Sequence, residues 1–229
     1  MIRMSVEVII EAQGVSKIYK RGRSEFVRAL SDINLKFYEA ELIVLRGESG
    51  SGKSTLLNIL SGLDNPSEGE IHFMGEDITK FNQKQLTELR RKNVGFIFQA
   101  WELIDNLTCL ENVEVPLYPS DLPMEKIRSD AKELLRRLEM HDEHFNKFPG
   151  ELSGGQSQRV GIARALIKQP KVIFADEPTA NLDSDNADII MNLLKRISRQ
   201  GTTVIVASHN ESLQKFADRV IMLSQGRMA

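Results

Sequence analysis

The sequence predicts an α/β fold, in which helices cover a mostly parallel sheet and a further helical segment is inserted. The first observation is that the fully apolar run at 42–45 leads directly into a glycine-rich turn and a helical pattern. The second is a change to mostly helical pattern between about 100 and 168. The third is a regular alternation of strand and helix patterns after Pro170, which is typical of parallel strands joined by helices. Its members are 172–175, 187–198, 203–208, 211–217 and 219–223.

The remaining elements follow from apolar spacing. The first 45 residues read as short strands, because 6–15 and 33–37 alternate apolar and polar positions. Apolar positions at helical spacing predict helices at 54–63 and 83–92. Strands are predicted at 70–75, between these helices, and at 94–99, after the second one. In the inserted segment, 124–140 is the clearest amphipathic helix. Its apolar face comprises Ile127, Ala131, Leu134, Leu135 and Leu138.

Composition limits the class of protein. The chain has 229 residues, 41% of them apolar, which fits one domain with a sizeable core. The chain has 30 Lys and Arg and 32 Asp and Glu, so it has no excess of positive charge, which argues against a dedicated nucleic-acid binder. No charge-free run approaches the ~20 residues of a membrane span, and Glu7 and Glu11 interrupt any signal peptide. The single Cys109 excludes an intramolecular disulfide and is expected to pack as a small apolar residue, so we expect a soluble cytosolic protein.

A phosphate-binding loop is predicted at 47–54, where GESGSGKS fits the pattern G-x-x-x-x-G-K-[ST] between a strand and a helix. Glycines let the backbone wrap closely round a polyphosphate, and the helix N-terminus adds partial positive charge. Lys53 can reach the β- and γ-phosphates, and the Ser54 hydroxyl can ligate Mg²⁺. The predicted nucleotide contacts in this loop are Gly47, Ser49, Gly50, Ser51, Gly52, Lys53, Ser54 and Thr55.

An acidic pair completes the predicted hydrolytic site. Asp176 ends the apolar run 172–175 and would hold the Mg²⁺ shell, and Glu177 could polarise the attacking water. A guanine-specific site would be expected to carry Asn-Lys-x-Asp, but Asn146 and Lys147 are followed by Pro149 at the Asp position. Guanine specificity therefore loses support.

A second anion-binding element is predicted at 152–156, LSGGQ, where Ser153 and two glycines open a helical pattern. It lies about a hundred residues after the phosphate loop. The two elements could share one site, or they could face each other across a dimer.

With these motifs the chain resembles the ATP-binding-cassette ATPases over nearly its whole length. Further matches are Gln99, the run ADEPTANLD at 175–183, and His209. The resemblance implies one domain over 1–229: a RecA-like P-loop NTPase core at 1–99 and 169–229, an N-terminal antiparallel β subdomain, and a helical subdomain at 100–168. It also implies ATP and Mg²⁺ as ligands.

The resemblance further implies roles for individual residues. Glu177, His209 and Lys53 would be catalytic; Ser54, Gln99 and Asp176 would hold the metal; and Tyr19 would stack on adenine. The family forms a head-to-tail dimer, in which Ser153 and Gly155 of one subunit would contact the γ-phosphate bound by Lys53 of the other. The remaining nucleotide contacts implied are Gly154, Gln156 and Asp183.

A narrower resemblance is to the ATPases of lipoprotein-releasing, macrolide-export and antimicrobial-peptide-resistance transporters, carried by 49–64, 95–99 and 107–117. It implies a membrane permease that docks near 99–117, and a cytoplasmic ATPase held at the inner face of the membrane. The cargo is open, and a regulatory clamp that signals through a membrane protein is an alternative. A cassette acting on DNA or ribosomes is less favoured, because long coiled coils and a second cassette are absent from the sequence.

Some residues depart from the family pattern or allow simpler interpretations. Ala40 and Asn210 replace a usual Gly and Asp, and Glu48 places an acid beside the phosphate loop. His141 and His144 lack a third metal ligand, so a solvated loop is expected there. The single tryptophan, Trp101, fits core packing and a partner-binding groove about equally.

Overall fold

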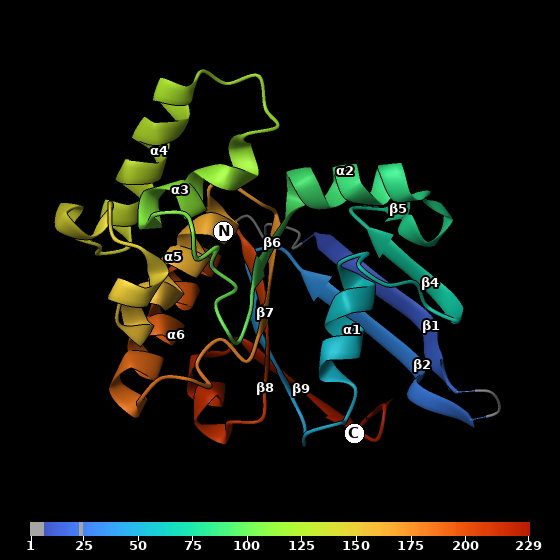
Figure 1. Cartoon of the computed structure of the whole chain (residues 1–229). Helices are drawn as coiled ribbons and strands as arrows, with labels where there is room; N and C mark the ends of the chain where they lie inside the picture. Colours follow the sequence, from blue (N-terminus) through green and yellow to red (C-terminus); the bar gives the residue numbers. More distant parts are fainter. Residues whose placement is uncertain (1–6, 23–24) are drawn as a thin grey trace, which may run out of the picture.

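The computed structural model describes residues 7–22 and 25–229, so Val6 at the start of the first predicted strand lies outside the described part. Two sheets organise the chain (Figure 1). A four-stranded sheet has the order β2-β1-β4-β5, and a six-stranded sheet has the order β10-β9-β3-β8-β7-β6. The predicted α/β class, with an antiparallel N-terminal part, is confirmed.

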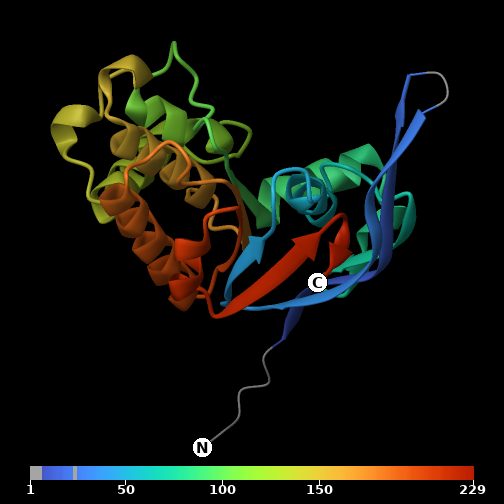
Figure 2. The ribbon, with the colours of Figure 1, turned by 90° about the horizontal axis from the view of Figure 1, so that it is seen from below.

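The N-terminal strands are longer than predicted. β1 (Val8–Arg21) and β2 (Glu25–Tyr38) pair as one antiparallel ladder, and Figure 2 shows this hairpin extending past the rest of the molecule. The prediction of short strands was wrong because irregularities in the register, between Ala12 and Lys17, break the simple alternation of apolar residues. β4 (Glu68–Phe73) and β5 (Glu76–Asp77) extend the same sheet.

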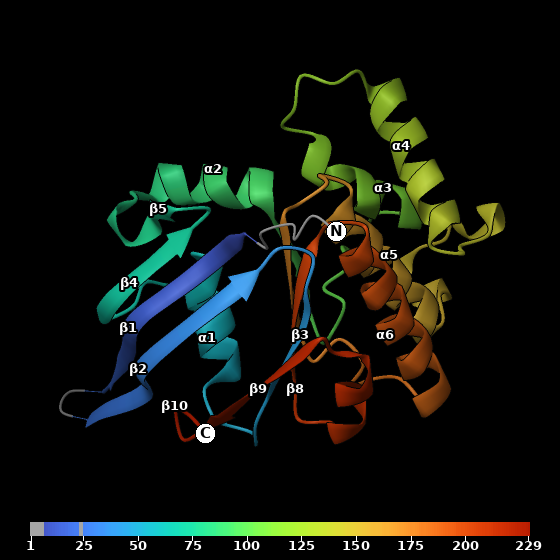
Figure 3. The ribbon, with the colours of Figure 1, turned by 180° about the vertical axis from the view of Figure 1, so that it is seen from behind.

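The larger sheet is mostly parallel, as predicted, and one edge strand is antiparallel. The parallel strands are β3 (Leu42–Arg46), β6 (Val94–Ile97), β7 (Val172–Asp176), β8 (Thr203–Ser208) and β9 (Arg219–Ser224). The short β10 (Arg227–Met228) pairs antiparallel with β9 (Figure 3). β3 lies between β8 and β9 although it comes first in the chain, so the strand order includes crossover connections.

Six α-helices surround the described sheets: α1 (Lys53–Leu60), α2 (Gln83–Asn93), α3 (Cys109–Glu114), α4 (Met124–Arg137), α5 (Gly154–Leu166) and α6 (Ser184–Arg199). Short 3₁₀ helices are η1 (Ile78–Lys80), η2 (Val115–Leu117), η3 (Asp142–His144), η4 (Pro149–Glu151) and η5 (Glu211–Phe216). The segment 211–217 was predicted as an α-helix and is the 3₁₀ helix η5. It has few residues to reach from β8 to β9, and a 3₁₀ helix covers more length per residue.

The parallel sheet separates two apolar cores. Alternate strand residues such as Val44 and Val206 face one core, which also takes side chains from α3, α4, α5 and α6. Their neighbours Leu45 and Ala207 face the other core, which is filled by α1 and by the antiparallel sheet. Helices α1 and α5 therefore lie on opposite faces of the parallel sheet. The buried Cys109 belongs to the first core, as expected.

The helices within the described ranges are each too short or too polar to cross a bilayer.

Candidate functional site

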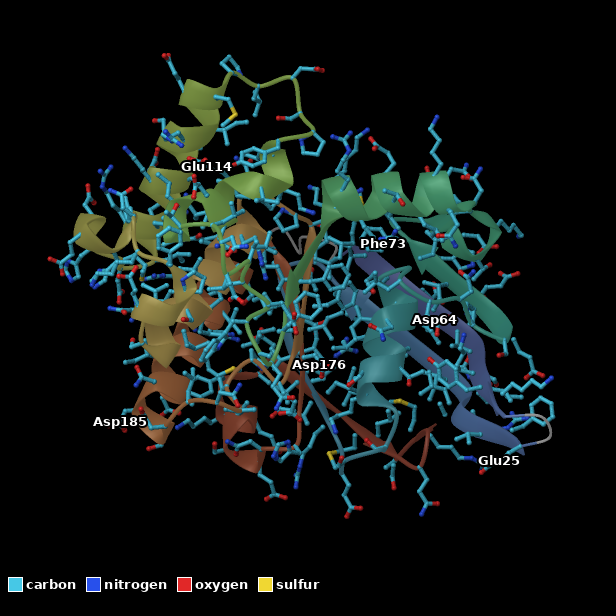
Figure 4. The ribbon with its side chains drawn as sticks, in the orientation of Figure 1. Glu25, Asp64, Phe73, Glu114, Asp176 and Asp185 are labelled. Atoms are coloured by element: carbon cyan, nitrogen blue, oxygen red, sulfur yellow. The ribbon has the colours of Figure 1, made fainter. Side chains whose placement is uncertain are left out.

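The predicted catalytic segments gather at the carboxyl edge of the parallel sheet. Gly47 follows β3, Glu177 follows β7, His209 follows β8, and Gln99 lies two residues beyond β6. Because β3, β8, β7 and β6 are parallel neighbours, their carboxyl ends share one edge, where open α/β sheets bind ligands. Figure 4 labels Asp176 at this edge, near the middle of the molecule.

The phosphate loop requires glycine at two positions. A Cβ on Gly47 would lie 2.2 Å from the Leu223 carbonyl oxygen. A Cβ on Gly52 would lie 2.7 Å from the Ala29 carbonyl oxygen, and Gly52 has a φ of +104°. Gly52 is the N-cap of α1, and no described side chain caps this helix end. The first N–H groups of α1 are therefore available to an anion.

Side chains of the loop fit a polyphosphate. The buried Lys53 ammonium donates to the carbonyl oxygens of Gly47 and Glu48, at 2.8 and 2.9 Å, which holds it against the loop. The Ser51 hydroxyl is buried and has no hydrogen-bond partner among the described residues. Ser54 is exposed at the start of α1. Glu48 is exposed too, so it contributes its carbonyl to the loop and leaves its carboxylate in solvent.

Glu177 is held in place by three donors. Its Oε1 accepts from the His209 backbone N–H at 3.0 Å and lies 2.7 Å from His209 Nδ1. Its Oε2 accepts from the Ser208 hydroxyl at 2.9 Å. Glu177 has a φ of +47°, an uncommon conformation for a residue with a side chain, and such strain is typical of functional sites. The predicted base and the predicted switch histidine are therefore already in contact.

One further contact joins two predicted segments. The Asn181 amide donates to the Gln99 carbonyl oxygen at 2.9 Å, which connects the segment after Glu177 to the end of β6.

Among the described residues, no group of three or more His, Cys, Asp and Glu could hold a metal ion. Ser54 and Asp176 nevertheless fit Mg²⁺, which binds through one or two carboxylates together with substrate phosphates and waters.

Tyr19 lies beside the phosphate-loop helix. Its phenol donates to Asp64 Oδ2 at 2.8 Å, and the Lys17 ammonium lies 4.9 Å from the centre of its ring. The pKa of Tyr19 is raised overall, chiefly by partial burial and also by the Asp64 carboxylate. A hydrogen bond with Thr55, in the first turn of α1, partly offsets this rise. Tyr19 is 38% exposed, which leaves part of the side chain accessible to a stacked base.

The LSGGQ segment opens helix α5 with a capping box. The Ser153 hydroxyl accepts from the Gln156 backbone N–H at 3.3 Å, and the Gln156 side chain accepts from the Ser153 backbone N–H at 2.8 Å. A Cβ on Gly155 would lie 3.1 Å from Asn186 Oδ1. Asp183 caps α6 by accepting from the Asn186 N–H, and this bond lowers the pKa of Asp183. The N-termini of α5 and α6 are therefore neighbours.

The structure separates the two predicted anion-binding elements. α1 follows the phosphate loop on one face of the parallel sheet, and α5 follows LSGGQ on the other face. The sequence left open whether both elements serve one site in a single chain. Their places on opposite faces favour the alternative, in which each completes a site with a second chain.

The sequence did not single out three of the contacts. Ser208 lies inside an apolar run and reads as an ordinary strand residue. Arg46, the last residue of β3, forms an ion pair with Glu211, just after His209. His144 was expected in a solvated loop, and this was wrong, because the residue is 8% exposed and its side chain contacts Gln156. No spacing rule could find these contacts, since each partner lies on a different element.

Trp101 packs against the start of α5, where an added Cβ on Gly154 would lie 3.4 Å from its ring. The Arg164 guanidinium of the same helix donates to the Trp101 carbonyl oxygen at 2.7 Å. Trp101 is partly buried and packs the segment after β6 against the LSGGQ helix.

Known proteins share this arrangement. Residues 30–180 match the family described as ABC transporter. An uncharacterised ABC transporter ATP-binding protein of Methanocaldococcus jannaschii is 45% identical over 96% of this chain and 97% of its own length. The macrolide export ATP-binding/permease protein MacB of Photorhabdus laumondii is 41% identical over 97% of this chain, which spans 34% of MacB.

A solved structure is similar throughout. It is the dimeric structure of the ATP-binding cassette MJ0796 in a post-hydrolysis state, bound to ADP and Pi. It has a TM-score of 0.88 and 42% identity, and the match covers 96% of this chain and 97% of that chain.

Proposed function

This chain belongs to the ABC transporter family and is an ATPase of that family, and from this premise we propose that it is the ATP-hydrolysing subunit of a membrane transporter that works in export. The gathering of the phosphate loop, Glu177 and His209 at one sheet edge carries this proposal. The likeness to a macrolide export protein supports the direction. On this proposal, residues 100–168 form a helical subdomain inserted in the nucleotide-binding core.

Hydrolysis follows from the placement of four groups. The loop N–H groups and Lys53 bind the phosphates and stabilise the negative charge that develops in the transition state. Glu177 accepts a proton from the attacking water, and His209 holds the Glu177 carboxylate in position. Bound Mg²⁺, held by Ser54, Asp176 and Gln99, would neutralise charge on the phosphate oxygens.

A second chain would complete each nucleotide site. Tyr19 contributes the adenine contact, and the phosphate loop contributes the phosphate contacts, from one subunit. The Ser153 hydroxyl and the first N–H groups of α5, those of Gly154 and Gly155, contribute from the partner. Gln156 and Asp183 brace this half by capping α5 and α6. ATP then holds two chains together, and hydrolysis releases them.

The dimer is tested with a variant that binds ATP and cannot activate water. Glu177→Gln keeps the side-chain size and removes the charge, and loss of a general base costs about 10²–10⁴-fold in rate. We expect this variant to form a dimer with Mg·ATP, measured by size-exclusion chromatography with light scattering at several protein concentrations. A second change, Ser153→Arg, crowds the surface that receives the partner's phosphate and should abolish the dimer.

The control is Ser198→Ala on α6, because Ser198 is buried away from the carboxyl edge of the sheet and its hydroxyl bonds only within its helix. Ser198→Ala in the Glu177→Gln background should dimerise normally. A Glu177→Gln protein that binds Mg·ATP and stays monomeric at all concentrations contradicts the composite site. Equal dimerisation with Ser153→Arg contradicts it as well.

A permease would hold the chain at the inner face of the cell membrane by docking on the segment 99–117. The exposed part of this segment includes Ile104, which is 44% exposed, whereas Leu103 packs against the core. The buried Asn112 side chain fixes the segment. Its amide oxygen accepts from the Ile104 backbone N–H, and its NH₂ group donates to the carbonyl oxygens of Ile104 and Leu107. A rigid loop that presents an apolar side chain can insert that side chain into a pocket of a partner protein.

We expect Ile104→Asp to release the chain from co-purified membranes while Mg·ATP binding is retained. The matched control is Ile189→Asp, since Ile189 on α6 is also 44% exposed. Membrane association that Ile104→Asp leaves undiminished would contradict docking at this surface.

A further inference from the structure

Gln156 uses both ends of its side-chain amide. Its Oε1 accepts from the Ser153 backbone N–H at 2.8 Å, and its Nε2 lies 3.0 Å from His144 Nε2. The Ser153 N–H can only donate, so it fixes which end of the amide is the oxygen. The Nε2 group therefore faces His144 and donates to it.

This bond determines the state of the histidine. An NH₂ group has no acceptor to offer, so His144 Nε2 must be the unprotonated nitrogen. The proton of the neutral ring then sits on Nδ1, which is buried and has no partner among the described residues. Because His144 is 8% exposed, water cannot readily replace the imidazole as acceptor.

The groups around His144 do not support a role in a buried ion pair or in metal binding. Glu143, on the same 3₁₀ helix, lies 3.7 Å from Nε2 and its side chain is 76% exposed. The His141 ring is 6.1 Å away, and the described residues include no cluster that could hold a metal ion. The group that faces His144 from α5 is the neutral Gln156 amide.

We propose that His144 is a positioning residue for the LSGGQ segment, acting through Gln156. Its acceptor nitrogen orients the Gln156 side-chain amide, so that Gln156 Oε1 accepts from the Ser153 backbone N–H. The Gln156 backbone N–H meanwhile donates to the Ser153 hydroxyl oxygen. The Ser153 hydroxyl proton then remains free to donate to a phosphate of the partner's nucleotide. This inference rests on the proposed composite site, and it adds a residue from η3, outside the LSGGQ motif.

The test compares two variants of equal length in the Glu177→Gln background. His144→Gln places an amide oxygen where Nε2 lies, whereas His144→Met fills the same space without a comparable acceptor. The readout is the protein concentration at which half of the chain is dimeric in Mg·ATP. We expect His144→Met to raise this concentration about tenfold, the effect of one lost hydrogen bond, and His144→Gln to stay near the parent.

A double-mutant cycle shows whether His144 acts through Gln156. Gln156→Ala should weaken the dimer, and adding His144→Met to it should weaken the dimer no further. Binding of Mg·ATP to each monomer, which depends on the phosphate loop, confirms that each variant is folded. If His144→Met does not fold, His144→Leu takes its place.

Three outcomes overturn the inference: His144→Met dimerises like the parent, His144→Gln is weakened as much as His144→Met, or the two losses add in the double variant. A different result marks failure of the proposed function itself. In that case the Glu177→Gln parent binds Mg·ATP and does not dimerise, and the role of His144 fails with it.

Discussion

The hydroxyl of Ser208 is expected to set the rate of hydrolysis without affecting the binding of ATP. Ser208 ends strand β8, is 1% exposed, and donates to Glu177 Oε2 at 2.9 Å. Ser208→Ala removes this donor and leaves His209 as the sole described partner of the carboxylate. The phosphate loop is untouched, so KM for ATP should change little.

The size of the effect follows from the charge of the acceptor. A hydrogen bond to a charged group contributes about 1.5–3 kcal/mol, and each 1.36 kcal/mol is tenfold in rate. If the bond holds Glu177 where it must receive the water proton, kcat should fall by roughly ten- to a hundredfold. Phosphate release at saturating Mg·ATP, over several protein concentrations, measures this directly.

The matched control is Ser198→Ala, which also removes a buried hydroxyl. Ser198 donates to the Lys195 carbonyl oxygen within α6, so its loss should leave kcat unchanged. A Ser208→Ala protein that is folded and hydrolyses ATP at the unaltered rate would refute the reasoning. A rise in KM with unchanged kcat would refute it too, because the hydroxyl would then serve binding.

Three further predictions concern stability and reactivity. Ala40 adopts a φ of +58°, where glycine is less strained, so Ala40→Gly should raise the free energy of unfolding by up to about 1 kcal/mol in a thermal or urea titration; a destabilised variant would contradict the strain. Hydrogen bonds from Lys80 and Thr79 lower the pKa of Asp77 to about 2, so its stabilising effect is complete above about pH 4 and is lost as the pH falls toward 2. Asp77→Asn should therefore lose less stability than the parent over that acid range in urea titrations, and an equal loss would contradict this. Burial raises the pKa of Cys109 to about 12, so a thiol reagent at pH 8 should label the chain only in denaturant, and rapid labelling of the folded chain would contradict it.

The sequence predicted those parts of the fold that depend on local pattern. A glycine-rich turn between a strand and a helix has a local signal, and so has Asp176 at the end of an apolar run, and the structure places both at the carboxyl edge of the sheet. The long β1–β2 hairpin was missed because its irregular register hides the alternation. The α4 helix was predicted to reach residue 140 and ends at Arg137, since Glu139 adopts a φ of +62°.

Side-chain partners from distant elements were beyond sequence reasoning. Ser208 and Glu177 are 31 residues apart, and they meet only because β7 and β8 are paired. The contact between His144 and Gln156 depends on how η3 lies against α5. Such contacts are set by packing of whole elements, which no spacing of residue types records.

The positions of α1 and α5 on opposite faces of one sheet have a consequence for mixtures of two inactive variants. If each nucleotide site takes one half from each chain, two inactive variants can repair each other. A chain with Lys53→Ala keeps a sound LSGGQ half, and a chain with Ser153→Arg keeps a sound phosphate loop. Their mixed dimer contains one site built from two damaged halves and one built from two sound halves. Mixing the two variants in equal amounts should restore up to roughly a quarter of normal ATPase activity, because half of the dimers are mixed and each has one working site.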